Sequence, residues 1–319
     1  MASLPGVSKT ILTGGLEICR ILNGMWQVSG AHGHIDVDKA VNEMIDYYDA
    51  GLTTFDMADI YGPAEVIYGR FLAKLKKARG EDAVKNVQGL SKFVPRPGPM
   101  TRQFHWWDYN DERYLEAMKH LQDLKTEGLI GEVSLTNFDT ARMMRMKEEG
   151  INLSSNQVQY SLVDMRPSVK MADFCVKNNI KLLTYGTLCG GLLSEKYLNK
   201  PEPTRSELNT ASLSKYKRMI DTWGGWALFQ ELLQTLDTIA KQHNVKISNI
   251  ATRYILDEPG VGGVIIGCRL GVPGCQHINN NLQTFHLKLT QSDRDKIECV
   301  IKKGQNLMSL IGDCGDEYR

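Results

Sequence analysis

The chain has 319 residues, of which 42% are hydrophobic and 24% are charged, and its formal net charge is +1. This is the composition of an ordinary globular protein, and its intermixed charges argue against a nucleic-acid or membrane partner. The seven cysteines are an odd number without Cys-x-x-Cys spacing, which argues against a disulfide framework or a zinc site. No apolar run reaches the roughly 20 residues that span a bilayer, and residues 1–10 lack a secretory signal pattern. We therefore expect a cytoplasmic protein.

Short apolar segments alternate with amphipathic segments along the whole chain, as in repeated strand–helix units with a parallel sheet. A hairpin that turns at Gly14-Gly15 comes first. In chain order we then expect strand 21–27, helix 36–50, strand 53–56, helix 64–79, strand 84–93, helix 111–127, strand 130–135, helix 140–149, strand 157–160, helix 168–178 and strand 180–185. A long polar loop, 186–214, precedes helices 226–243 and 247–257, strand 263–267 and short helices 276–282 and 291–303.

The length fits either one α/β barrel of about 250 residues or two domains of about 150 residues each. No linker or shift in composition interrupts the repeating unit. We therefore expect a single barrel domain over residues 1–319, in which the chemistry lies at the carboxyl ends of the strands.

Four side chains that follow expected strands form a plausible proton-donating set: Asp56, Tyr61, Lys92 and His105. A tyrosine has an ordinary pKa of about 10, and a nearby ammonium group lowers that pKa. A carboxylate can hold the lysine in place, and a histidine can orient the substrate oxygen or relay the proton. Each residue also has a structural interpretation: Asp56 as a helix cap, and Tyr61 and His105 as packed rings.

The segment from Asp56 to Glu65, D-M-A-D-I-Y-G-P-A-E, resembles the motif after the second strand of the aldo-keto reductase family. Ser91-Lys92 and Phe104-His105 also match, and the resemblance extends along the whole chain. It implies a TIM (β/α)8 barrel that uses NADP(H), with NAD(H) also possible, to reduce an aldehyde or ketone without a metal. Tyr61 would be the general acid, Lys92 and Asp56 the ion pair that tunes it, and His105 the residue that orients the carbonyl.

The resemblance also implies a set of cofactor-binding residues. Asn137 and Gln159 look like the pair that binds the nicotinamide carboxamide, although Asn137 is also a common turn residue. Tyr185 looks like the ring that stacks on the nicotinamide, although it too could be a packed aromatic. Gly186, Leu188 and Gly191 look like parts of the pyrophosphate loop. Arg269 suits the 2′-phosphate, and Asn280 and Asn281 match positions that contact adenine.

One segment departs from the family. Only twelve residues, 93–104, separate Lys92 from His105, and three of them are prolines, whereas a parallel crossover needs a dozen residues or more and usually a helix. We therefore expect a barrel that is incomplete or distorted at its third helix and fourth strand, as if a segment were missing between Thr101 and Gln103.

Three functions remain open for this chain. It could be a reductase of a small-molecule carbonyl substrate, a cofactor-binding regulatory barrel like some channel subunits, or an inactive truncated variant. We expect a monomer or a weak oligomer.

Overall fold

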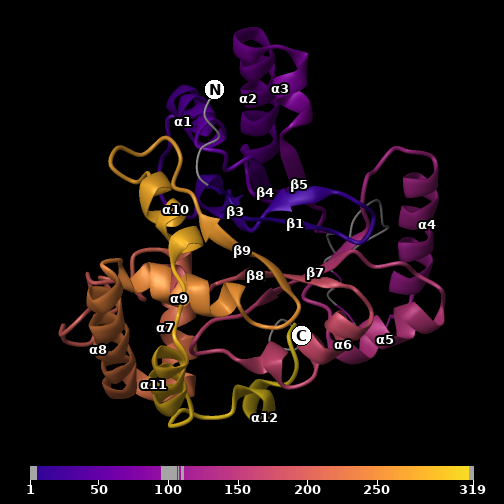
Figure 1. Cartoon of the computed structure of the whole chain (residues 1–319). Helices are drawn as coiled ribbons and strands as arrows, with labels where there is room; N and C mark the ends of the chain where they lie inside the picture. Colours follow the sequence, from indigo (N-terminus) through magenta and orange to yellow (C-terminus); the bar gives the residue numbers. More distant parts are fainter. Residues whose placement is uncertain (1–5, 95–105, 107, 109–110, 316–319) are drawn as a thin grey trace.

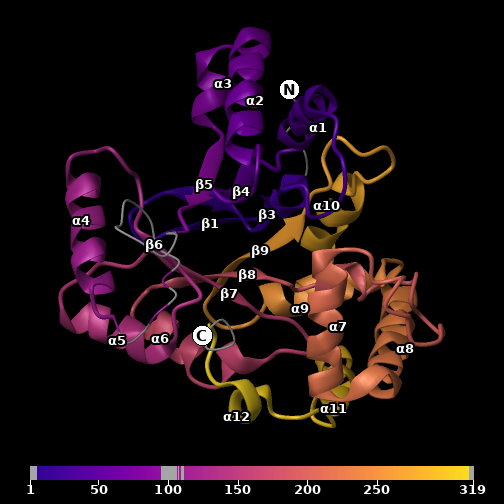
Figure 2. The same ribbon diagram turned by 180° about the vertical axis from the view of Figure 1, so that it is seen from behind.

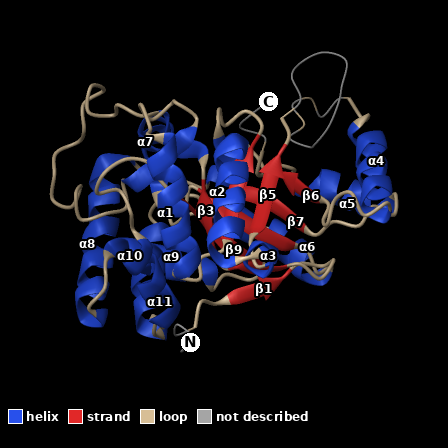
Figure 3. Ribbon diagram, turned by 90° about the horizontal axis from the view of Figure 1, so that it is seen from above, coloured by secondary structure: helices blue, strands red, loops and turns tan. Residues whose placement is uncertain are grey.

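Seven parallel strands form a curved, nearly closed sheet at the centre of the computed structural model, which describes residues 6–94, 106, 108 and 111–315. Their order around the sheet is β5-β4-β3-β9-β8-β7-β6. The bounds are Ile21–Gly24 for β3, Thr54–Ala58 for β4, Gln88–Lys92 for β5, Ser134–Thr136 for β6, Ser155–Gln159 for β7, Lys181–Tyr185 for β8 and Val261–Gly267 for β9. Figure 3 shows these strands enclosed by helices. The expected TIM-type barrel is confirmed.

Helices follow most strands and cover the outside of the sheet (Figure 1). Their bounds are Val37–Asp49 for α1, Ala64–Arg79 for α2, Glu81–Lys85 for α3, Tyr114–Thr126 for α4, Thr140–Glu148 for α5, Met171–Lys177 for α6, Ala211–Trp223 for α7, Gly225–His243 for α8, Ile247–Leu256 for α9, Ile278–His286 for α10, Gln291–Ile301 for α11 and Leu307–Ile311 for α12. Three 3-10 turns add Trp26–Val28, Arg166–Ser168 and Cys189–Gly191. No helix within the described ranges is both long and apolar enough to cross a membrane.

Local sequence explains the helix that follows the motif. Ile67, Phe71 and Leu75 of α2 recur at a spacing of four residues, so they form one buried face against the barrel. Gly80 adopts a φ of 89°, which favours glycine, and α2 ends there. The expected bounds of this helix agree with the structure.

A hairpin closes the amino end of the barrel. Its strands, β1 (Lys9–Ile11) and β2 (Glu17–Cys19), pair antiparallel around the expected glycine turn. Leu12 and Ile18 pack inside the barrel with Leu183 and Ile265. The carboxyl ends of the strands, which carry the candidate residues, therefore form the open mouth.

The barrel is open on one side. Among the described residues, β5 pairs with β4 and β6 pairs with β7, but β5 and β6 do not pair with each other. This gap lies where the sequence predicts a missing strand and helix. Figures 1 and 2 show α4, the next helix, standing at the periphery on the side opposite α8.

Several sequence expectations for secondary structure were wrong. The strand expected at 21–27 ends at Gly24, and the strand expected at 130–135 covers only Ser134–Thr136. The loop expected at 186–214 ends earlier, because α7 begins at Ala211 and its N-cap Thr210 accepts a hydrogen bond from the Leu213 amide. The strand expected at 84–93 is shorter: α3 extends to Lys85, and β5 begins at Gln88.

Candidate active site

A buried ion pair lies at the mouth. Lys92, the last residue of β5, donates to both carboxylate oxygens of Asp56 on β4, with both N–O distances at 2.8 Å. The two side chains are only 11% and 5% exposed. Burial lowers the pKa of Lys92, although the Asp56 carboxylate opposes that shift. The pair that the sequence predicted is therefore present in the fold.

Tyr61 lies beside this ion pair. The Lys92 ammonium nitrogen is 5.0 Å from the centre of the Tyr61 ring, and the Trp26 ring packs edge-on against Tyr61 with centroids 4.9 Å apart. The Tyr61 amide donates to the carbonyl of Ala58 at 3.0 Å, which fixes the turn after β4. The three described members of the predicted catalytic set therefore converge.

The expected direction of the Tyr61 pKa shift was wrong. Burial raises the pKa of Tyr61 well above its ordinary value, and the negative charge of Asp56 raises it further. Lys92 does not reverse this shift, because both Asp56 oxygens already bind its ammonium. Tyr61 is therefore a neutral phenol at physiological pH.

The fourth predicted residue, His105, lies outside the described residues, as does Trp107. Trp106 is described and buried; its indole donates to the carbonyl of Asp111 at 2.9 Å and its ring packs near Tyr114. Trp223 is also buried, and its indole lies against Gly304, which follows α11. Among the tryptophans that the structure describes, Trp26 packs against Tyr61.

Sequence reasoning missed Gln157. Its side-chain amide on β7 donates to Asp56 at 2.7 Å, so it holds the carboxylate from another strand of the barrel. The available signal was its spacing from Gln159, since residues two apart on a strand face the same side. The ion pair thus has a third, neutral partner that the motif does not contain.

Three predicted nicotinamide residues lie at adjacent strand ends. The Tyr185 hydroxyl, at the end of β8, donates to the Asn137 side-chain oxygen at 2.8 Å. Asn137 follows β6 with a φ of 57°, and its amide donates to the Gln157 carbonyl at 2.9 Å. Gln159 pairs in register with Tyr185, and its side-chain NH₂ donates to Asp164 at 2.7 Å.

The loop after β8 is covered by the start of α7. Gly186 has a φ of 71°, and a Cβ there would meet the Tyr216 ring, so the loop needs glycine at this position. The ammonium of Lys215 lies 5.1 Å from the centre of the Tyr185 ring. Leu188 is half-buried, whereas Gly191 is exposed at the loop's outer edge.

The residues predicted at the phosphate and adenine end are more dispersed. Arg269 is exposed and donates to the carbonyl of His32 at 2.8 Å. Asn280 donates to Ser248 at 3.0 Å and so joins α10 to α9. Asn281 is buried on α10. No described contact joins these asparagines to Arg269 directly.

Unsatisfied buried atoms test whether these residues fit a nicotinamide cofactor. Within the described part of the chain, Gln159 Oε1 and Asn281 Nδ2 are buried without a hydrogen-bond partner. Buried polar groups normally have partners, so such atoms suit a polar ligand. One atom is an acceptor on a residue predicted to bind the carboxamide, and the other is a donor on a residue predicted to contact adenine. Five other described atoms are also without a partner, so the chemistry of this pair is compatible with the cofactor but is not specific to it.

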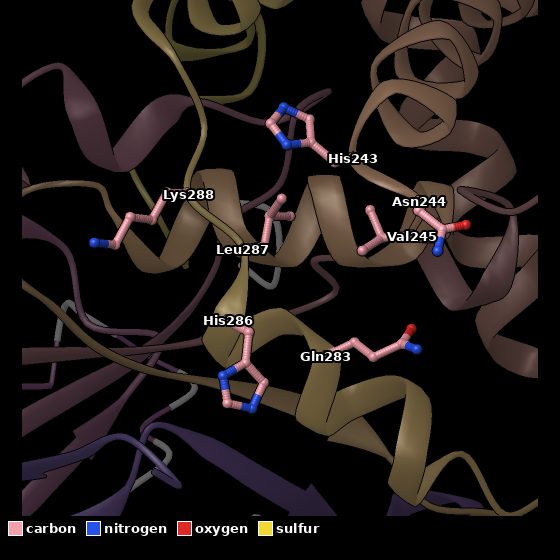
Figure 4. A pocket seen from close by; sticks show the side chains of 7 residues that line it. All are labelled: His243, Asn244, Val245, Gln283, His286, Leu287 and Lys288. Carbon is pink, nitrogen blue, oxygen red and sulfur yellow. The ribbon is translucent and has the colours of Figure 1, made fainter. Parts of the chain in front are cut away.

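A separate surface hollow of about 210 Å³ lies between the ends of α8 and α10. Figure 4 shows its side chains, including those of His243, His286 and Lys288, pointing in different directions rather than toward one point. His243 is already paired with Asp293 at 2.9 Å. This hollow does not include the residues of the mouth.

Several named proteins are similar to this chain in sequence. It is 24% identical to the chloroplastic pyridoxal reductase of Arabidopsis thaliana, over 81% of this chain and 75% of that protein. It is also 24% identical to the aldo-keto reductase YhdN of Bacillus subtilis, over 80% of this chain and 82% of that protein. It is 32% identical to flagellar radial spoke protein 5 of Chlamydomonas reinhardtii over 51% of this chain, a match that spans only 34% of that protein.

Solved structures share the fold. The glycerol dehydrogenase of Gluconobacter oxydans superposes with a TM-score of 0.72 at 20% identity and covers 96% of this chain and 97% of its own. A thermostable aldo-keto reductase solved with the inhibitor epalrestat superposes with a TM-score of 0.65 at 20% identity. The match covers 92% of this chain and 99% of that one.

The model of the aldo/keto reductase family matches residues 20–103 and 101–302. The two matched parts meet at the segment where the sequence predicts a deletion, so the interrupted match confirms the gap. This chain belongs to the aldo/keto reductase family.

Proposed function

We propose that this chain binds NADP(H) at the barrel mouth and reduces an aldehyde or ketone, with Tyr61 as the proton donor. The observation that carries the proposal is the convergence of the partly buried Tyr61 with the buried pair of Lys92 and Asp56. Family membership supports carbonyl reduction in general. The choice of cofactor and of proton donor is the proposed part.

Two groups of residues would hold the cofactor. Asn137 and Gln159 suit its carboxamide, because Gln159 Oε1 is a buried acceptor without a partner. Tyr185 offers a ring for stacking, and its hydroxyl is fixed by Asn137. Arg269, an exposed guanidinium, suits the 2′-phosphate that distinguishes NADP from NAD. The chemistry that a reduced nicotinamide supplies in such a site is hydride transfer to the carbonyl carbon.

The protein's own residues would supply the proton. Tyr61 is protonated at neutral pH, so its hydroxyl hydrogen would be available when the carbonyl oxygen gains negative charge. The raised pKa makes the phenol a weaker acid, so the transfer would depend on the charge that develops on that oxygen. The O–H bond of Tyr61 then breaks, and the new O–H bond forms on the product alcohol. Lys92 stabilises the phenolate that remains, since its ammonium lies at the ring. Asp56 holds Lys92 in that position, and Gln157 in turn binds Asp56.

The substrate class is proposed from the wall beside Tyr61. Trp26 packs edge-on against Tyr61, so an apolar surface borders the phenol ring. The relatives named above include a pyridoxal reductase and a glycerol dehydrogenase, which act on different carbonyl–alcohol pairs. We therefore propose a small aldehyde or ketone without naming one.

A second candidate is a cofactor-binding barrel with little or no turnover. The open side of the sheet favours it, because Lys92 is the last residue of a strand that has one described neighbour. A displacement of about 1 Å at a catalytic group can cost roughly 100-fold in rate. Such a loss would leave cofactor binding in place.

One experiment separates these functions. NADPH is titrated into the purified full-length chain while tryptophan fluorescence is recorded, and NADPH oxidation is then measured with an aromatic aldehyde. Quenching with turnover supports the reductase, whereas quenching without turnover supports the binding barrel. No quenching with either NADPH or NADH refutes both.

A further inference from the structure

Among the residues that the structure describes, two almost fully buried charged side chains, Asp164 and Arg166, belong to neither the predicted catalytic set nor the predicted cofactor set. Arg166 is 1% exposed and Asp164 is 0% exposed. The guanidinium forms two bonds of 2.8 Å to the two oxygens of Asp164. Burying such a pair costs several kcal/mol per ion in desolvation, so its geometry must be well satisfied to persist.

The Asp164 carboxylate of this ion pair also binds the side chain of Gln159. Asp164 Oδ2 accepts from the Gln159 side-chain NH₂ at 2.7 Å. That bond fixes the orientation of the amide and leaves Gln159 Oε1 as the buried atom without a partner. The amide cannot rotate by 180° without placing two oxygens against each other. The ion pair therefore determines which atom of Gln159 faces a ligand.

The other side of the ion pair contacts the C-terminal segment, Gly312–Cys314. Arg166 Nη1 donates to the Asp313 carbonyl at 3.3 Å. Asp313 is itself only 4% exposed.

The same segment also contacts the strand end that carries Asn137. The Asp313 carboxylate accepts from the amide of Thr140, the first residue of α5, at 2.9 Å. Thr140 is three residues after Asn137, and an anionic group is favourable at a helix N-terminus. Asp313 thus joins the end of β6 to the end of β7 through Arg166.

We propose that the C-terminal segment positions Asn137 and Gln159 and so sets the affinity of the mouth for the carboxamide end of the cofactor. This inference rests on the proposed function. Arg166 and Asp313 are positioning residues, because they act through Gln159 and α5 rather than by touching a ligand. The consequence is selective: the nicotinamide half of the cofactor depends on the segment and the adenosine half does not.

The test compares two ligands on the full-length chain. Dissociation constants are measured for NADPH and for adenosine 2′,5′-bisphosphate, which lacks the nicotinamide. Asp313→Ala should weaken NADPH binding by about tenfold, the equivalent of losing one well-placed hydrogen bond, and leave the bisphosphate within about twofold. Arg166→Lys, which keeps the charge but not the paired geometry, should act in the same direction.

Two control variants address the same carboxylate. Asp313→Asn keeps an acceptor oxygen and should restore NADPH affinity to near the parent value. Lys170→Ala removes the half-exposed ammonium that lies 3.4 Å from Asp313 and should leave both affinities unchanged. Amide hydrogen exchange without cofactor should become faster in Asp313→Ala at residues 137–142, because the variant loses the carboxylate that binds the Thr140 amide but keeps the backbone carbonyl that binds Arg166.

The outcomes are distinguishable. Equal weakening of both ligands in folded Asp313→Ala, or no weakening of either, overturns the positioning role but leaves the proposed cofactor site intact. If the parent chain binds neither ligand, the proposed function fails and this inference fails with it.

Discussion

Substituting Lys92 should show how strongly the stability of the fold depends on the ion pair at the mouth. Lys92→Met keeps most of the side-chain volume but leaves the Asp56 carboxylate 5% exposed, with Gln157 as its remaining described partner. Breaking a buried ion pair from one side costs about 3–5 kcal/mol. With an unfolding entropy of about 2.1 cal/mol/K per residue, this lowers the Tm by about 4–8 °C. The double variant Asp56→Asn/Lys92→Met should recover most of the loss, because no charge remains buried.

The assay is urea unfolding followed by circular dichroism, with a matched exposed pair as the control. Lys85 and Asp82 also lie 2.8 Å apart, but their side chains are 70% and 92% exposed. Lys85→Met should unfold within error of the parent, since exposed pairs contribute little. The reasoning is refuted if Lys92→Met costs no more than Lys85→Met, or if the double variant is as unstable as the single one.

Two further predictions concern the phosphate end and pH. Arg269→Ala should raise the Kd for NADPH by about 10–100-fold, the value of a charge-assisted contact, and leave the Kd for NADH unchanged; equal changes for both cofactors would remove Arg269 from the 2′-phosphate site. Burial raises the pKa of Glu258, which accepts from the Tyr160 hydroxyl at 3.0 Å. The folded state therefore binds the Glu258 proton more tightly than the unfolded state. The stability that protonated Glu258 contributes is fully present below the ordinary pKa of glutamate, and it is lost as the pH rises through the raised pKa of the folded state. Glu258→Gln should flatten that part of the stability–pH curve in denaturant titrations, and an unchanged slope would show that another group causes it.

Much of the barrel could be predicted because its helices carry local signals. α2 was predicted with the correct ends, since its buried face repeats and Gly80 stops it. α7 was missed because Gly190-Gly191, Pro201 and Pro203 suggested a loop that continued past its start. The N-cap at Thr210 was the local signal that could have found it.

The site was predictable where a motif fixes the spacing and unpredictable where the fold brings distant side chains together. The pair of Asp56 and Lys92 followed from the motif. The bond from Gln157 to Asp56 joins residues 101 positions apart on separate strands, so no local pattern contains it. The pKa shift of Tyr61 was misjudged because its largest cause is burial of the phenol in the folded barrel, which no local pattern shows.

The most direct test of the central claim is the rate of NADPH oxidation by Tyr61→Phe with a saturating aldehyde. Phenylalanine keeps the ring that packs on Trp26 and removes only the hydroxyl. We expect the parent to turn over and the variant to lose about 10²–10⁴-fold in rate with an unchanged NADPH Kd. A variant that reduces the aldehyde as fast as the parent would contradict the assignment of Tyr61 as the proton donor.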